Sequence, residues 1–174
     1  MIARVLILVI AALHTQFVFA FTCTRNYTVI KGDTCDAISQ THNVSTYQLA
    51  VLNPTINSGC TNLEISQCLC LGSSQADCTK TYTVSVGDYC QKISDEFGLS
   101  GAMLYANNPY ISAVCDNIDI GQVLCVDKAY NVPPLQPNQP KPSIDPTPKK
   151  EVYPPKPTSD DDLPWCKDGE DEWE

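Results

Sequence analysis

Cysteine is the residue type in this chain with the widest chemical potential, and ten cysteines follow residue 20. Structural zinc sites favour pairs of cysteines with about two to four residues between them, together with histidines. Cys68 and Cys70 are separated by a single residue, and His42 is the only histidine after residue 20. An even number of cysteines in an exported chain is typical of a disulfide framework. We therefore expect disulfides, with no metal site and no cofactor.

The cysteines belong to an internal repeat, which is the strongest organising signal in the sequence. Residues 23–70 align with residues 78–125 without a gap, and 21 of the 48 aligned positions are identical. The identities form ordered motifs: C-T-x-x-Y-T-V, G-D-x-C, N-P-x-I, C-x-N and Q-x-L-C. The repeat predicts two copies of one small module, joined by a polar linker at 71–77.

Carboxyl groups are the other candidates for chemistry, because glycoside hydrolysis uses two of them about 5–9.5 Å apart. Asp33 and Asp88 are the only acid kept as aspartate in both copies. Each stands where a helix N-cap is expected. His42 has no counterpart in the second copy, so no repeated nucleophile–base pair exists. The sequence therefore predicts a chain that is not an enzyme.

Residues 1–20 are predicted to be a secretory signal peptide. Arg4 provides the positive charge, residues 5–13 are apolar, and residues 18–20 read Val-Phe-Ala. The alternative is a membrane anchor, but the apolar run is short for a span of about 20 residues. We expect a secreted, extracellular protein without a membrane segment.

The mature chain is acidic and ends in a region of biased composition. The net charge is −9, which gives no basic surface for nucleic acid or anionic membranes. Residues 127–174 hold eleven of the 13 prolines and an acidic end. This composition predicts an extended, disordered tail without a packed core. A neutral polar ligand is compatible with these charges.

Each module is predicted to be α+β, with the order strand, helix, helix, strand. The first strands are Tyr-Thr-Val at 27–29 and 82–84, and the last are at 64–70 and 119–125. Ile38 and Ile93 are expected in the cores of the modules. Second helices begin near Ser45 and Ser100 and end before the Asn-Pro pairs at 53–54 and 108–109.

Disulfides are expected to compensate for the small core of a module of about 48 residues. Antiparallel pairing of the first and last strands favours four bridges, although the sequence leaves three connectivities open in each module. They are Cys23–Cys70, Cys35–Cys60, Cys78–Cys125 and Cys90–Cys115. Cys68 and Cys166 have no counterpart in the repeat. They pair with each other, or at least one is free or intermolecular.

The motifs in this order resemble the LysM domain in its cysteine-bearing fungal form. The resemblance covers residues 23–70 and 78–125 and rests on five motifs that occur twice. Two such modules without a catalytic domain look like the secreted LysM effectors of fungi. That resemblance implies binding of chitin and other N-acetylglucosamine oligomers. It also implies a role in virulence, either hiding chitin fragments from host receptors or shielding the fungal wall.

In that family the sugar lies between two loops, one before the first helix and one after the second. Carried onto this chain, the resemblance implies ligand contacts from both copies. In the first copy they are Gly32, Asp33, Thr34, Leu52, Asn53, Pro54, Thr55 and Ile56. In the second they are Gly87, Asp88, Tyr89, Asn107, Asn108, Pro109, Tyr110 and Ile111. Backbone amides would bond the acetamido group, and isoleucine would receive its methyl group.

The second copy departs from the family pattern at two places. Tyr89 replaces the threonine of G-D-T, and Asn107 replaces the leucine before Asn-Pro. These changes predict unequal affinities, and Tyr110 is expected to lie against a sugar ring. Two usable sequons, Asn26 and Asn43, are predicted to carry glycans, both in the first copy.

Three functions remain open at this point. The leading one is sequestration or shielding of chitin, in which two linked sites gain avidity or form a ligand-induced dimer. The alternative is a structural cell-wall protein, anchored through LysM with the tail as a spacer. The third is a protein–protein module that has lost carbohydrate binding.

Overall fold

The computed structural model describes residues 21–135 and 139–142 of the 174. The predicted signal peptide (1–20), Cys166 and most of the predicted tail lie outside these residues. Within the described residues, no helix has the length and apolar character needed to cross a bilayer.

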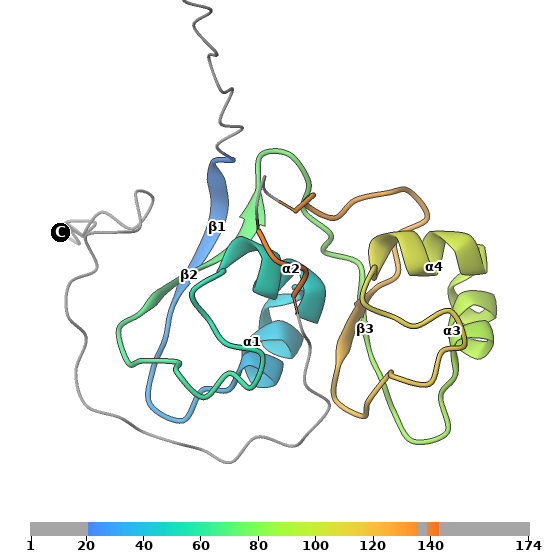
Figure 1. The fold of residues 1–174 in the computed structure, drawn as a ribbon, viewed down its shortest axis with the longest axis horizontal. Helices are drawn as coiled ribbons and strands as arrows, with labels where there is room; N and C mark the ends of the chain where they lie inside the picture. The colour runs from blue at the N-terminus through green and yellow to red at the C-terminus, as the bar shows by residue number, and fades with distance from the viewer. Residues whose placement is uncertain (1–20, 136–138, 143–174) are drawn as a thin grey trace, which may run out of the picture.

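The described chain folds into two α+β modules with the same order of elements, as the repeat predicts (Figure 1). Module 1 contains β1 (Cys23–Thr28), α1 (Cys35–His42), α2 (Thr46–Leu52) and β2 (Cys68–Ser73). Module 2 contains β3 (Thr81–Thr83), α3 (Cys90–Phe97), α4 (Gly101–Asn107) and β4 (Val123–Cys125). In each module the first and last strands pair antiparallel, with Tyr27 opposite Leu69 and Tyr82 opposite Leu124.

Helix starts agree only partly with the predicted caps. Ser45 and Ser100 cap α2 and α4, because their hydroxyls accept from the N–H groups of Gln48 (3.1 Å) and Met103 (3.2 Å). The N-cap role predicted for Asp33 and Asp88 is wrong. Thr34 is the N-cap of α1, and Tyr89 occupies that position before α3 without a side-chain bond. The aspartates lie one residue earlier and bind the preceding turn instead.

The last strands begin later than the predicted residues 64 and 119. A turn precedes each of them, closed in module 1 by the bond from Gln67 N to Glu64 O (3.1 Å). The Gln67 side chain also accepts from Glu64 N (3.0 Å), and Gln122 forms the same pair of bonds with Asp119. The repeated glutamine of Q-x-L-C therefore closes a turn before the strand starts.

Four disulfides have the connectivity that strand pairing favours. Cys23 at the start of β1 is bridged to Cys70 within β2, and Cys78 just before β3 is bridged to Cys125 at the end of β4. Cys35–Cys60 and Cys90–Cys115 join each first helix to the loop after the second. Cys68 is also disulfide-bonded, so a free thiol at this position is wrong. Its predicted partner, Cys166, lies outside the described residues.

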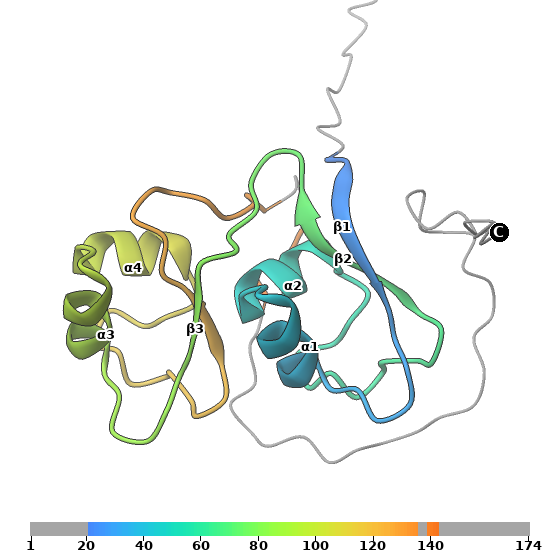
Figure 2. The ribbon, with the colours of Figure 1, turned by 180° about the vertical axis from the view of Figure 1, so that it is seen from behind.

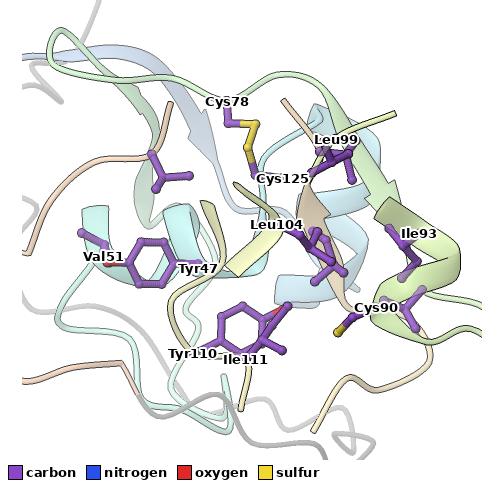
Figure 3. Close-up of a cluster of buried hydrophobic side chains, with 14 residues drawn as sticks. Tyr47, Val51, Cys78, Cys90, Ile93, Leu99, Leu104, Tyr110, Ile111 and Cys125 are labelled. Carbon is purple, nitrogen blue, oxygen red and sulfur yellow. A yellow bond between two sulfur atoms is a disulfide. The ribbon is translucent and has the colours of Figure 1, made fainter. Parts of the chain in front are cut away.

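The described residues form two hydrophobic cores, one within module 1 and one, here called the shared core, that holds residues of both modules. Tyr47 and Val51 of α2 belong to the same buried cluster as Leu104, Tyr110 and the other core residues of module 2 (Figure 3). Ile38 of module 1 and Ile93 of module 2 are buried, as predicted. Because α2 contributes to both cores, the modules have a fixed relative orientation.

Polar contacts reinforce this junction and hold the predicted linker. Gln48 on α2 is fully buried, donates to Leu71 O (2.6 Å) and Asp77 Oδ1 (2.8 Å), and accepts from Cys78 N (2.9 Å). Arg25 on β1 forms an ion pair with Asp77 at 2.6 Å. A linker held at both Asp77 and Cys78 leaves little freedom between the modules.

The first residues of the predicted tail pack on module 2 rather than extending into solvent. Val132 is fully buried in the shared core. Asn107 at the end of α4 donates to Asp127 O and Ala129 O (both 2.9 Å) and accepts from Asn131 N (2.9 Å). The expectation of a segment without packing is therefore wrong for residues 127–133, because buried Asn107 bonds their backbone and Val132 is itself buried.

Candidate functional site

The first loop of each module, residues 30–34 and 85–89, is a turn held by its aspartate. Asp33 Oδ2 accepts from Tyr27 OH (2.7 Å) and Ile30 N (2.9 Å). Asp88 Oδ2 accepts from Tyr82 OH (2.7 Å) and Ser85 N (2.7 Å). The glycine before each aspartate has a positive φ, 96° at position 32 and 82° at position 87, which favours glycine over other residues. The aspartates thus shape the loop backbone.

Asp88 also has a cationic partner that Asp33 lacks among the described residues. Lys92 Nζ lies 2.7 Å from Asp88 Oδ1, one helical turn along α3. The bonds from Lys92, Tyr82 and Ser85 lower the pKa of Asp88 from 3.8 to about 2. The hydrogen bond to Asp88 raises the pKa of the Tyr82 hydroxyl. Asp88 is therefore a firmly ionised structural group at neutral pH and is unsuited to donating a proton.

This lowered pKa predicts an acid-dependent loss of stability. Because the folded pKa lies below the unfolded one, ionised Asp88 stabilises the fold above about pH 4, and this contribution disappears as the pH falls through about 2. We expect Asp88→Asn to be less stable than wild type at pH 7 and to lose less stability between pH 4 and pH 2. Denaturant unfolding across that range measures both effects.

The matched control is Asp95→Asn, which changes an exposed carboxylate on α3. This variant should keep the wild-type change in stability between pH 4 and pH 2. An Asp88→Asn profile that parallels wild type would contradict the assigned role.

The second loop of each module, residues 53–60 and 108–115, starts with an asparagine that joins helix to strand. Asn53 donates to Leu49 O (2.8 Å) and Cys70 O (2.7 Å) and accepts from Cys70 N (2.8 Å). Asn108 makes the equivalent bonds to Leu104 O, Cys125 O and Cys125 N. Both side chains are buried and fully used, so they position the second loop and do not reach a ligand.

A further repeated asparagine, from the C-x-N motif, orders the middle of the second loop. Asn62 accepts from Asn57 N (2.9 Å) and donates to Thr55 O (2.8 Å). Asn117 does the same with Ser112 N (2.7 Å) and Tyr110 O (2.9 Å). The C-x-N motif is identical in both copies of the repeat, but the sequence alone does not indicate its role. Its function is to fix the loop backbone without a regular element.

A disulfide brings the two loops of each module together. Cys35 directly follows the first loop, and its Cα lies 6.1 Å from that of Cys60 at the end of the second loop. In module 1 the structure gives no protein partner, within its described residues, for the N–H groups of Gly32, Thr34 and Thr55. The paired loops thus present backbone N–H groups that can donate hydrogen bonds to a ligand carbonyl.

The residues predicted to contact a ligand fall into two groups. One group lies at least partly exposed on the paired loops: Gly32, Asp33, Thr34, Pro54, Thr55, Ile56, Gly87, Asp88, Tyr89 and Pro109. The other is buried in the fold: Leu52, Asn53, Asn107, Asn108, Tyr110 and Ile111. The sequence motif includes both groups because the residues that hold the loops are interleaved with those that face solvent.

The two modules differ most at their aromatic residues. Tyr110, predicted to lie against a sugar ring, is only 8% exposed and its hydroxyl is 3.4 Å from Gln122 Oε1. Burial raises the pKa of this hydroxyl well above its ordinary value. Tyr89, by contrast, is 57% exposed on the first loop. On the paired loops of module 2, the exposed aromatic side chain is therefore Tyr89.

Two further predictions concern modification and metals. Asn26 and Asn43, the predicted glycosylation sites, are both exposed, on β1 and at the C-terminal end of α1. Among residues 21–135 and 139–142, no group of three or more metal-binding side chains converges.

A family model and several relatives match this chain. The model of the LysM domain matches residues 27–72 and 82–127, just over half of the sequence. A Gibberella moniliformis protein named Non-secreted LysM effector LCP1 is 37% identical over 120 residues, covering 66% of this chain and 16% of that protein. Secreted LysM effector LysM2 of Penicillium expansum is 26% identical over 60% of this chain and 33% of its own length.

A third relative, Secreted LysM effector LysM1 of Trichophyton rubrum, is 27% identical over 64% of this chain and 54% of its own length. In each of these three comparisons the chain spans less than two thirds of the relative. The names of the relatives divide between secreted and non-secreted effectors.

Proposed function

This chain belongs to the LysM domain family, and on that basis we propose that it binds N-acetylglucosamine oligomers, chiefly chitin, without cleaving them. The observation that carries the proposal is the pair of disulfide-joined loops in each module, with backbone donors beside apolar side chains. Chitin is uncharged, and each of its sugar units carries an acetamido group, which combines an amide with a methyl group. Backbone N–H groups bond the carbonyl, and Ile56 offers surface to the methyl group in module 1.

The electrostatics of the loops support binding without hydrolysis. Glycoside hydrolysis needs one carboxyl group that stays protonated near neutral pH. Asp88 has a pKa lowered to about 2, and Asp33 accepts hydrogen bonds from the Tyr27 hydroxyl on β1 and from Ile30 N. Neither carboxylate is placed to act as a proton donor to a glycosidic oxygen.

The two sites are proposed to act as one rigid bivalent unit. The shared core around Tyr47 and Val51 fixes their relative orientation. A polymer that reaches both sites gains avidity through effective concentration, and one that cannot will link two protein molecules into a ligand-induced dimer. We propose export through residues 1–20 and action outside the cell, hiding chitin fragments from host receptors or shielding the fungal wall.

Calorimetric titration with N-acetylglucosamine oligomers of increasing length tests the binding proposal. We expect Tyr89→Ala to weaken the site in module 2 by roughly three- to tenfold, because it loses one aromatic contact. Thr55→Glu should weaken module 1, because it places charge and bulk beside the free backbone donor. Binding of no oligomer length by wild type would contradict the proposal.

Each variant has a matched control outside the loops. Tyr130 is 58% exposed, nearly the same as Tyr89, so Tyr130→Ala removes an equivalent aromatic ring from elsewhere on the surface. Thr24 is exposed on β1, so Thr24→Glu introduces the same charge away from the loops. Both controls should bind like wild type. Loss of affinity in a control would mean that the loops are not the site.

A further inference from the structure

A pocket of about 310 Å³ lies on module 1 beside the second loop, and the chain beyond module 2 forms one of its walls. This size is at the lower end of small-molecule sites, which run from roughly 300 to 1,000 Å³. Leu49 and Ala50 of α2, Pro54 and Ile56 of the second loop, and the Cys35–Cys60 disulfide supply most of the lining. The lining is mainly apolar, with polar groups from Thr46, Asn57 and Ser58.

Residues 139–142, here called the strap, close one side of this pocket. All four residues of the strap line it. The Gln139 amide donates to Val51 O on α2 (2.8 Å), which fixes the strap against the helix. Figure 1 shows this orange end of the described chain lying across α2. Pro140 and Pro142 restrict the backbone of the strap, so the wall is preorganised at low entropic cost.

We propose that the strap is a specificity-determining part of the ligand site of module 1 and that the pocket holds one further N-acetylglucosamine unit. The inference rests on the proposed function. Pro54 and Ile56 of the second loop line the pocket, as does the disulfide that joins the two loops, so the pocket adjoins the paired loops and a sugar chain bound there can extend into it. The apolar lining suits ring C–H groups and the acetyl methyl.

The polar groups around the pocket suit a neutral sugar. Lys141 is exposed on the strap and lines the pocket, where its ammonium group can donate to hydroxyl or amide oxygens. Thr46 contributes a hydroxyl that also accepts from Val123 N of module 2 (2.9 Å). Apart from the strap, the residues that line the pocket all belong to module 1. The two sites therefore differ in length as well as in their aromatic residues.

Calorimetric titration of the full chain in the Tyr89→Ala background reduces the contribution of module 2 to the measured binding. We expect Gln139→Ala combined with Lys141→Ala to weaken binding of an N-acetylglucosamine hexamer by roughly three- to tenfold, and to weaken the shortest bound oligomer less. Leu135→Ala, an exposed position outside the pocket, is the control. Thermal unfolding should show that the variants keep the wild-type fold.

A second variant approaches the pocket from the helix. Ala50→Phe fills it and should also weaken hexamer binding, whereas Ala102→Phe, on the exposed face of α4, should not. Unchanged or tighter hexamer binding by the strap variants and Ala50→Phe would overturn the inference while leaving the proposed function intact. Failure of wild type to bind any oligomer would instead overturn the proposed function.

Discussion

Asn108→Ala is expected to lower the free energy of unfolding by about 3 kcal/mol, because three hydrogen bonds disappear from a fully buried position. The backbone groups of Leu104 and Cys125 would lose partners that water cannot replace. Asn53→Ala should have a similar cost in module 1, since its three bonds are equivalent. Equilibrium denaturant unfolding measures both losses.

The near-isosteric variant Asn108→Asp separates hydrogen bonding from packing. An aspartate keeps the shape of the side chain but turns an oxygen toward the carbonyls of Leu104 and Cys125, to which Asn108 donates. We expect it to destabilise the protein at least as much as alanine at pH 7. Thr79→Ala, an exposed position on the linker side of β3, serves as the control. A loss below about 1 kcal/mol for Asn108→Ala would contradict the role of the Asn108 hydrogen bonds in joining α4 to β4.

Gln48→Met is expected to lower the free energy of unfolding by about 2–3 kcal/mol and to loosen the junction of the modules. Methionine matches glutamine in length but makes none of the bonds to Leu71 O, Asp77 and Cys78 N. In wild type the shared core should give one cooperative transition. In the variant we expect the transition to broaden or divide, as seen by scanning calorimetry.

The control for Gln48 lies on the neighbouring helix. Gln40 also bridges the modules, through a 3.1 Å bond to Gly121 O, but it is exposed. Gln40→Met should cost less than about 0.5 kcal/mol, because water replaces an exposed hydrogen bond. Equal effects of the two variants would mean that burial of Gln48 does not hold the junction. Amide exchange at Cys78 provides an independent measure, since its N–H donates to Gln48.

Local patterns in the sequence predicted much of the architecture of each module. The repeat, the serine caps before α2 and α4, and the pairing of first and last strands all depend on short-range signals. Two of the four disulfides follow from that strand pairing, which brings Cys23 on β1 close to Cys70 on β2 and Cys78 close to Cys125. Ile38 and Ile93 follow from helical periodicity. Figure 2 shows from behind that the helices of both modules have equivalent places.

The sequence predictions that the structure contradicts involve contacts between residues distant in the sequence. Aspartate is a residue type favoured at N-caps, but the carboxylates of Asp33 and Asp88 accept hydrogen bonds from tyrosines six residues earlier. The sequence predicts that Asn107 alters the ligand site, whereas its side chain bonds to backbone groups 20 to 24 residues later. No local pattern reports such partners. The strap is a similar case, because its contact with Val51 spans 88 residues.

The binding of N-acetylglucosamine oligomers through the loop backbones is tested most directly by amide-resolved NMR titration of the full chain. We expect the largest shifts at Gly32, Thr34 and Thr55 in module 1 and at the equivalent first loop, Gly87 and Tyr89, in module 2. Amides of the strand pairs should shift little. Saturable shifts confined to other surfaces, or no shifts at any oligomer length, would contradict the account.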